Sequence, residues 1–281
     1  MASMKNIKLR INSVQSTMQI TRAMKLVASS RLRKAQQRVE NARPYHEILA
    51  KTLSDIANSN SDFDSVYLKK REIKKSLYIV FAGDRGLCGG YNSNMFKKIE
   101  EETKGKNCIF LPVGKKALEY FGKRDREILT KAFPLVGDIS VSDCFEMSRI
   151  VCEGFAKGDY DEIYVAGTYF KSVLSQIPEC NKLLPFSPKD VEGDREVILY
   201  EPGSEETFNA IIPEYIAGII FSAFCESAAS EQGARRMAME NATDNASEMI
   251  DSLSLYYNRA RQASITQEIT EIVAGSQGEV G

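Results

Sequence analysis

The 281-residue sequence lacks tryptophan and has a single histidine, His46. One histidine excludes a metal site built on two histidines and argues against a Ser-His-Asp triad. The acidic residues and cysteines also lack the clustered spacing of a metal site. The sequence therefore predicts no catalytic residue, no metal and no cofactor, and His46 is interpreted as a surface or hinge residue.

Cysteine is scarce, and no two cysteines form a C-x-x-C pair. This argues against a thioredoxin-like redox motif and against a zinc ribbon. The cysteines are Cys88, Cys108, Cys144, Cys152, Cys180 and Cys225. We expect reduced and mostly buried thiols, as in a cytosolic protein.

Long apolar runs are also missing. The start, MASMKNIKLRINS, has no apolar segment of signal-peptide length and no Ser/Arg-rich, acid-free leader. The most apolar run, residues 211–225, is interrupted by Pro213 and Glu214. It is shorter than the ~20 residues that a helix needs to cross a bilayer. We therefore expect neither a targeting segment nor a membrane span.

Glycine and proline are absent from two long stretches, residues 1–43 and 234–274. Charge of one sign is nearly absent from each end. Residues 1–40 have nine bases and one acid, whereas residues 201–281 have thirteen acids and four bases. Such asymmetry often marks an arm for nucleic acid or membrane. Because the opposite excess lies in the same chain, mutual attraction of the two ends is the simpler interpretation.

The N-terminal stretch has the apolar spacing of a coiled coil, in alternating steps of four and three residues. The seam residues are Ile7, Ile11, Val14, Met18, Thr21, Lys25, Ala28, Leu32, Ala35 and Val39. This pattern predicts a long helix over residues 1–58, with an end or kink at Pro44.

The seam becomes polar at Thr21 and Lys25. One interpretation is a tolerated polar position that sets the register of the pair. The other is that this part of the helix faces a different partner, because Ile20, Met24 and Val27 form a second apolar stripe beside the seam.

The C-terminal segment, residues 207–275, predicts a second long helix that begins near Pro213, a residue suited to a first turn. Its expected seam is Met239, Ala242, Ala246, Met249, Leu253, Tyr256, Ala260 and Ala263. This helix outruns the first, and its last turns have apolar residues at Ile265, Ile269, Ile272 and Val273. An exposed apolar stripe requires a cover, so this tip docks either on its own chain or in an external partner.

The middle of the chain alternates predicted strands and helices, which favours a parallel, three-layered α/β domain over residues 70–203. The expected strands are 76–82, 108–113, 162–166 and 196–200, and the expected helices are 94–103, 115–121 and 141–157. The predicted fold is thus α/β, a long antiparallel two-helix coiled coil of the N- and C-terminal helices with an inserted Rossmann-like domain.

A glycine-rich loop, GDRGLCGGYN, follows the first strand at residues 83–92. Such a loop can hold phosphate on backbone N–H groups, but this one matches neither G-x-x-x-x-G-K-[ST] nor G-x-G-x-x-G. We favour a tight turn close to a neighbouring element. Cys88 is interpreted as a buried structural thiol, although the nearby Arg85 is able to lower a thiol pKa.

Four segments resemble the gamma subunit of the F-type ATP synthase, bacterial type. They are MKNIKLRINSV at 4–14, QITRAMKLVA at 19–28, DRGLCGGYN at 84–92 and YNRARQASITQEITEIV at 257–273. The resemblance implies a central stalk whose coiled coil turns inside a ring of three alpha and three beta subunits. It implies that the domain stands with the epsilon subunit on the membrane c-ring, and that catalysis occurs elsewhere.

The resemblance also implies roles for individual positions. Contact with the beta subunits is expected at Met24, Arg261, Gln262, Thr266 and Glu268. The apolar tip of Ile265, Ile269, Ile272 and Val273 is expected to turn in an apolar sleeve of the ring. Lys25 departs from the acidic residue of some members, so no salt link of theirs is transferred to it.

The same resemblance places the protein peripherally on the cytoplasmic face of a bacterial plasma membrane, held there only through the complex. The inserted dithiol loop of chloroplast gamma subunits is missing, which argues against redox control through it. Two rival functions stay open. An α/β nucleotide-binding enzyme would bind ATP on the isolated chain, and a basic-helix nucleic-acid binder would bind duplex DNA in a salt-sensitive way.

Overall fold

The computed structural model describes residues 4–59, 65–188, 200–201 and 203–278. Residue contacts divide the chain into two units. The globular unit is residues 28–235, and the helical unit combines residues 1–27 with 236–281. Two long helices, α1 (Met4–Ser59) and α5 (Ser204–Gly278), contribute to both units. Each unit is described by itself.

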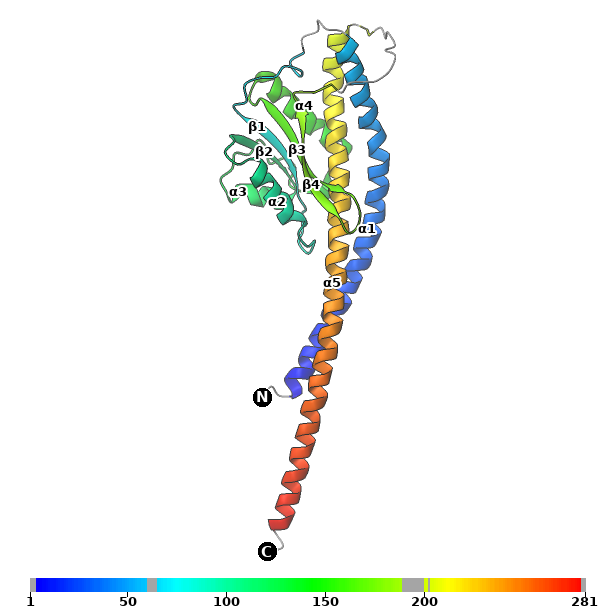
Figure 1. The fold of residues 1–281 in the computed structure, drawn as a ribbon, viewed down its shortest axis with the longest axis vertical. Coiled ribbons are helices and arrows are strands. Elements are labelled where there is room, and N and C mark those ends of the chain that lie inside the picture. The colour runs from blue at the N-terminus through cyan, green and yellow to red at the C-terminus, as the bar shows by residue number, and fades with distance from the viewer. Residues whose placement is uncertain (1–3, 60–64, 189–199, 202, 279–281) are drawn as a thin grey trace. The chain divides into compact units, whose positions relative to one another are not determined.

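The globular unit inserts strands and shorter helices between α1 and α5 (Figure 1). In chain order they are β1 (Ser76–Phe81), α2 (Tyr91–Glu102), β2 (Cys108–Val113), α3 (Lys115–Gly122), a short 3-10 helix (Val136–Asp138), α4 (Val141–Lys157), β3 (Glu162–Phe170) and β4 (Gln176–Leu184). Three predicted strands and three predicted helices are confirmed. The fourth predicted strand, 196–200, lies outside the described residues except for Tyr200, which is not in a strand.

The sheet has the strand order β2-β1-β3-β4. β1 pairs in parallel with both β2 and β3, whereas β4 pairs antiparallel with β3. The prediction of a purely parallel sheet was therefore wrong, because β4 was missed. Its sequence, QIPECNKLL, contains Pro178 and little apolar alternation. Both features are tolerated at the edge of a sheet, where one side of the strand needs no partner.

Side chains of β1 point alternately to the two faces of the sheet. Helices pack on both faces, so the domain has three layers, helix, sheet and helix. Tyr78 and Val80 join a core with α2 and α3. Leu77, Ile79 and Phe81 join a larger core that contains residues of α4, α1 and α5. The period of two along a strand explains this division. The predicted three-layered α/β arrangement is confirmed.

Within the globular unit, α1 and α5 run antiparallel against this larger core. Burial raises the pKa of the Cys225 thiol on α5, and the charge of Arg38 on α1 partly opposes this rise. A Cβ added at Gly218 on α5 would lie 3.1 Å from the ring of Tyr45 on α1. Later residues of α1 thus meet earlier residues of α5. The predicted antiparallel pair is confirmed here.

Both prolines lie inside helices, which agrees with the helix expected across residues 1–58 and corrects the expectation that Pro213 lies in a first turn. α1 does not end at Pro44 but continues to Ser59, and α5 begins at Ser204 rather than near Pro213. Proline removes one helical hydrogen bond. Fully buried apolar side chains beyond each proline, including Ile56 and Phe208, hold both helices to the core and offset that loss.

Within the helical unit, α1 and α5 also pair antiparallel. The hydroxyls of Thr21 and Thr243 lie 2.8 Å apart, and Lys25 Nζ is 2.7 Å from Glu240 Oε1. Every predicted seam residue of α1, from Ile7 to Lys25, is buried or half-buried. The polar-seam interpretation of Thr21 and Lys25 is therefore confirmed.

The predicted seam of α5 was partly wrong. Met249, Tyr256 and Ala263 are exposed, and their successors Ile250, Tyr257 and Ser264 are half-buried instead. The observed stripe advances from Met239 in steps of four, then three, whereas the prediction used three, then four. The predicted and observed seams have every second position in common, because both repeat every seven residues. At some of the positions where they differ, small residues fit either seam, so the sequence did not decide between them.

By length and composition α5 qualifies as a candidate membrane span over Ser204–Val273, with an 18-residue window of mean hydropathy 1.5. However, 44% of that window is buried inside the protein. Apolar residues of α5 such as Ile212, Ile216 and Ile220 belong to the core of the globular unit. A core helix passes the same composition test, so we interpret the window as a core helix.

Candidate functional site

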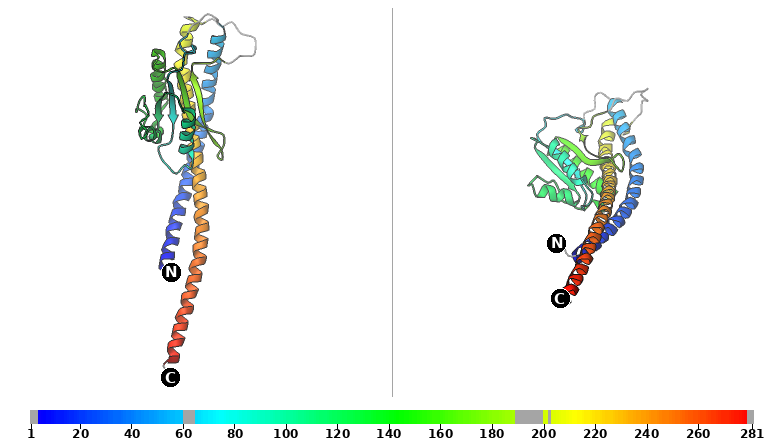
Figure 2. Two further views of the ribbon diagram at one scale, coloured as in Figure 1. Left: turned by 60° about the vertical axis from the view of Figure 1, so that its left-hand side comes forward. Right: turned by 60° about the horizontal axis from the view of Figure 1, so that its bottom comes forward.

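The last turns of α5 expose an apolar stripe. The exposed fractions are 48% for Ile265, 56% for Ile269, 71% for Ile272 and 50% for Val273. In the helical unit α5 runs past the N-terminal end of α1 (Figure 2). Among the described residues, the tip is therefore not docked on its own chain. The cover of this tip by an external partner stays a prediction.

The expected contact residues lie at two separate levels of the helical unit. Arg261, Gln262, Thr266 and Glu268 are exposed near the tip, and Thr266 Oγ1 donates to the Gln262 carbonyl at 2.9 Å. Met24 is half-buried and adjoins Lys25, whose partner is Glu240. From 240 to 261 a helix rises about 30 Å. The structure thus groups the four α5 residues but separates them from Met24.

A second exposed apolar surface lies beside Met24 on α1. Ile20, Leu26 and Val27 are each more than half exposed. Ile20 and Val27 belong to the stripe that the sequence placed beside the seam, whereas Leu26 was not singled out. Because the seam itself is occupied by α5, this stripe is available to another partner.

The ion pair between Lys25 and Glu240 gives a testable prediction. We expect Lys25→Glu to lower the thermal stability of the chain slightly, because two carboxylates then face each other, and Lys25→Glu with Glu240→Lys to restore it. Helical circular dichroism during heating measures the effect. A double variant as weak as the single one would contradict the pairing.

The same pair has a defined pH dependence. The hydrogen bond and the charge of Lys25 lower the pKa of the Glu240 carboxyl below its ordinary value. Its contribution to stability is therefore present above the ordinary carboxyl pKa and is lost as the pH falls through the lowered one. The difference between wild type and Lys25→Glu should accordingly shrink in acid.

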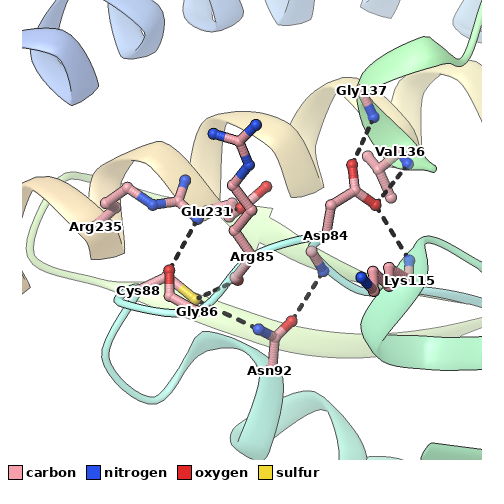
Figure 3. Close-up of polar contacts among 11 residues, drawn as sticks. Asp84, Arg85, Gly86, Cys88, Asn92, Lys115, Val136, Gly137, Glu231 and Arg235 are labelled. Atoms are coloured by element: carbon pink, nitrogen blue, oxygen red, sulfur yellow. Dashed lines mark hydrogen bonds and ion pairs between the residues drawn. The ribbon is translucent and has the colours of Figure 1, made fainter. Parts of the chain in front are cut away.

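The glycine-rich loop of the globular unit is held by Asp84 (Figure 3). The Asp84 carboxylate accepts hydrogen bonds from the backbone N–H groups of Lys115 at 3.1 Å, Val136 at 2.9 Å and Gly137 at 3.0 Å. Lys115 begins α3, so Asp84 ties the start of the loop to the N-terminus of α3 and to the 3-10 helix.

The loop also approaches α5 closely. A Cβ on Gly83 would lie 2.9 Å from Glu231 Oε1, and Arg235 Nη2 donates to the Gly86 carbonyl at 3.4 Å (Figure 3). A side chain at position 83 would therefore have to displace the Glu231 carboxylate. These contacts favour the predicted tight turn over a phosphate cradle.

A cleft of about 410 Å³ in the globular unit does not favour nucleotide binding either. It is lined by residues of β3, β4 and the two long helices, and three of them are carboxylates, Glu47, Glu179 and Glu226. Carboxylates at these positions repel the phosphates of a nucleotide.

The described cysteines are all free, and four of the six are buried. Burial raises the pKa of the thiols of Cys144 and Cys152 to about 12 and of Cys180 and Cys225 to about 11. Burial also raises the pKa of Cys88, although the nearby Arg235 partly opposes it. The interpretation of Cys88 as a structural thiol is supported.

These thiols should be slow to react. The thiolate is the nucleophile, and a raised pKa leaves little thiolate near neutral pH. We expect slow maleimide labelling of the native chain and ordinary labelling of the same chain in urea, measured by mass spectrometry. Rapid native labelling of Cys88, Cys144, Cys152 or Cys225 would contradict the burial of that thiol.

Sequence reasoning missed the polar face of α5 that contacts the sheet and the loop. Glu226, Ser227, Ser230 and Glu231 are buried there. The signal was present as the run ESAASE, in which polar residues recur four positions apart inside an otherwise apolar helix. On a helix this spacing places them on one face.

Comparisons with known proteins agree with this architecture. A sequence model of the family described as ATP synthase matches residues 3–278. The chain is 45% identical to the ATP synthase gamma chain of Ruminococcus albus, over 98% of each chain. It is 41% identical to the sodium-ion-specific ATP synthase gamma chain of Acetobacterium woodii, again over 98% of each chain.

A solved structure shares the fold. A chain in the cryo-EM structure of the Euglena gracilis mitochondrial ATP synthase, described as OSCP/F1/c-ring in rotational state 3, aligns with a TM-score of 0.69. The alignment covers 98% of this chain and 94% of the other at 21% identity. Because the family match and the near-full-length relatives agree with this architecture, the chain belongs to the family of ATP synthase gamma chains and is a subunit of the ATP synthase complex.

Proposed function

We propose that this chain is the central rotor shaft of a bacterial F-type ATP synthase. It couples ion flow through the c-ring to ATP synthesis or hydrolysis at the beta subunits by rotation, and it is not catalytic itself. Three alpha and three beta subunits surround its helical unit. The globular unit stands with the epsilon subunit on the c-ring, so that the chain is peripheral to the cytoplasmic face of the plasma membrane.

One observation carries this proposal. The paired helices expose an apolar tip at Ile265, Ile269, Ile272 and Val273, and the described chain does not cover it. A shaft that turns inside a ring requires such a cover from its surroundings. The ring also has to leave the shaft free to turn, which suits the mostly polar and small residues elsewhere on the exposed surface of this helix.

The assembly test is purification from native membranes. We expect this chain to co-purify with the alpha and beta subunits after mild detergent extraction. Isolation of the chain without those ATPase subunits would sink the rotor proposal. Stoichiometric ATP binding by the isolated chain in equilibrium dialysis would instead favour the nucleotide-binding alternative, and we expect none.

The proposed contact residues have a matched control. Arg261 and Arg259 are both exposed arginines on the same helix, two positions apart and so on different faces. We expect Arg261→Ala to lower the ATPase rate of the assembled complex several-fold, because a charged contact with the beta subunits is lost. Arg259→Ala should change it little. Equal rates in the two variants would contradict the assignment of Arg261.

A further inference from the structure

The end of β3 has an unusual partner. β1 pairs with β3 only as far as Ala166, although β3 continues to Phe170. Over residues 167–170 one side of β3 still pairs with β4. Its other side faces α5, and side chains of α5 bond to the backbone there. A helix thus takes the position that a neighbouring strand would occupy.

Three side chains of α5 make these bonds. The Thr168 N–H donates to Ser227 Oγ at 3.0 Å, and Ser230 Oγ donates to the Thr168 carbonyl at 2.9 Å. The Phe170 N–H donates to Glu226 Oε2 at 2.9 Å. Both serines are almost fully buried. Buried bonds of this kind compete poorly with water and are costly to leave unmade.

One turn further along, α5 bonds to the glycine-rich loop (Figure 3). Arg235 Nη2 lies 2.5 Å from Glu231 Oε1 and also donates to the Gly86 carbonyl. Both side chains are about nine-tenths buried, with 11% of Arg235 and 12% of Glu231 exposed. This second anchor lies on the same face of the helix as the first.

Two glycines allow the helix to come this close. A Cβ on Gly167 would lie 2.9 Å from Ser227 Oγ, and a Cβ on Gly83 would lie 2.9 Å from Glu231 Oε1. The first glycine belongs to β3 and the second to the loop. We name the five α5 residues Glu226, Ser227, Ser230, Glu231 and Arg235 the α5 clamp.

Apolar packing sets which face of α5 is buried, and directional bonds add a further restraint on the angle of the helix about its own axis. Apolar packing is non-directional, so it restrains small changes of that angle less sharply than hydrogen bonds do. Hydrogen bonds need donor and acceptor in line, and they weaken steeply when the angle changes. The α5 clamp places such bonds on two separate elements of the α/β domain, β3 and the loop.

We propose that the α5 clamp is the joint that holds α5 against turning about its own axis relative to the α/β domain, so that torque passes between them without slip. This inference rests on the proposed rotor function, because only a shaft under torque needs such a joint. The clamp residues position the helix, and they take no part in the chemistry of the beta subunits.

The test measures torsional compliance in the assembled complex. A nanorod is attached to a cysteine introduced at the exposed Lys123 of the globular unit, with the alpha–beta ring fixed and stalled by nucleotide. The angular variance of the rod reports the stiffness of the rotor. For Ser227→Ala with Ser230→Ala we expect the variance to rise roughly twofold, because two of the three bonds to β3 are lost.

The control carries the same chemical change on the same helix. Ser247→Ala with Ser252→Ala replaces two exposed serines of α5, and its variance should match the wild type. A second pair tests the clamp if the double serine variant does not assemble. Glu226→Gln keeps an oxygen that accepts from Phe170, whereas Glu226→Met does not, so only the methionine variant should increase the variance.

Different results of this experiment would overturn the α5 clamp and the rotor function. Equal variance in every assembled variant would overturn the clamp while leaving the rotor intact. A wild-type complex that hydrolyses ATP without moving the rod would instead overturn the proposed function. Coupling gives a further readout, because clamp variants should pump fewer ions per ATP hydrolysed against an opposing gradient, and the exposed-serine control should not.

Discussion

A chain truncated after Ser264 is expected to lower torque or assembly yield while its α/β domain still folds. The removed residues include the exposed apolar positions Ile265, Ile269 and Ile272. They contribute nothing to the described core of the globular unit, which draws on residues 32–229. The truncation removes the apolar surface that an external ring would cover. The binding free energy from burying that surface is lost with it.

Two measurements on the truncated chain separate the alternatives. Denaturant unfolding of the isolated chain should give the wild-type midpoint for the globular unit. Reconstitution with alpha and beta subunits should give fewer complexes or a lower torque per complex. Loss of the domain's fold would support docking of the tip on its own chain, and full torque at full yield would contradict a role for the tip.

The second large effect is expected from Gly114→Ala at the junction of β2 and α3. Gly114 has φ +100° and ψ 153°, a region that only glycine occupies readily. An added Cβ would lie 2.1 Å from the Ala82 carbonyl oxygen and 2.5 Å from Val136 Cγ2. Backbone strain and the clash together should cost about 4 kcal/mol of the free energy of unfolding.

A matched control lies at the other end of the same helix. Gly122 ends α3, and no atom lies within 4 Å of a Cβ added there. We expect Gly122→Ala to be neutral or slightly stabilising, because alanine favours helix more than glycine does. Chemical denaturation of both variants measures the difference. A Gly114→Ala chain as stable as Gly122→Ala would contradict the described backbone at this junction.

Much of the fold could be predicted from periodicity. The seam of α1 and the strand–helix alternation from Ser76 to Lys157 are strong local patterns, and the structure confirms them. β4 was missed because an edge strand with Pro178 has no clear apolar alternation. The seam of α5 was misplaced because its small residues fit two registers, and only contact with α1 decides between them.

The two prolines show a different limit. Local propensity predicts an end or kink at Pro44 and a helix start near Pro213, whereas α1 continues through Pro44 to Ser59 and α5 begins at Ser204. The deciding energy is tertiary, because both helices bury apolar residues against one core on each side of the proline. A single sequence does not show which segments will share that core.

The candidate site is even less visible in a single sequence. A rotor needs no cluster of reactive side chains, so its working residues are ordinary exposed ones such as Arg261 and Glu268. Their roles followed from resemblance alone, and they stay predictions. The α5 clamp was hidden for another reason, because serine in an apolar helix becomes informative only when its backbone partners on β3 are known.

The central claim is that this chain rotates within the ATP synthase complex, and direct observation of that rotation tests it. The slow native cysteines allow selective labelling of a cysteine introduced at Lys123, and a probe there reports the angle of the globular unit. With the alpha and beta subunits fixed to a surface, ATP should drive stepwise rotation of the probe in one direction. Steady ATP hydrolysis by the complex with a stationary probe would contradict the account.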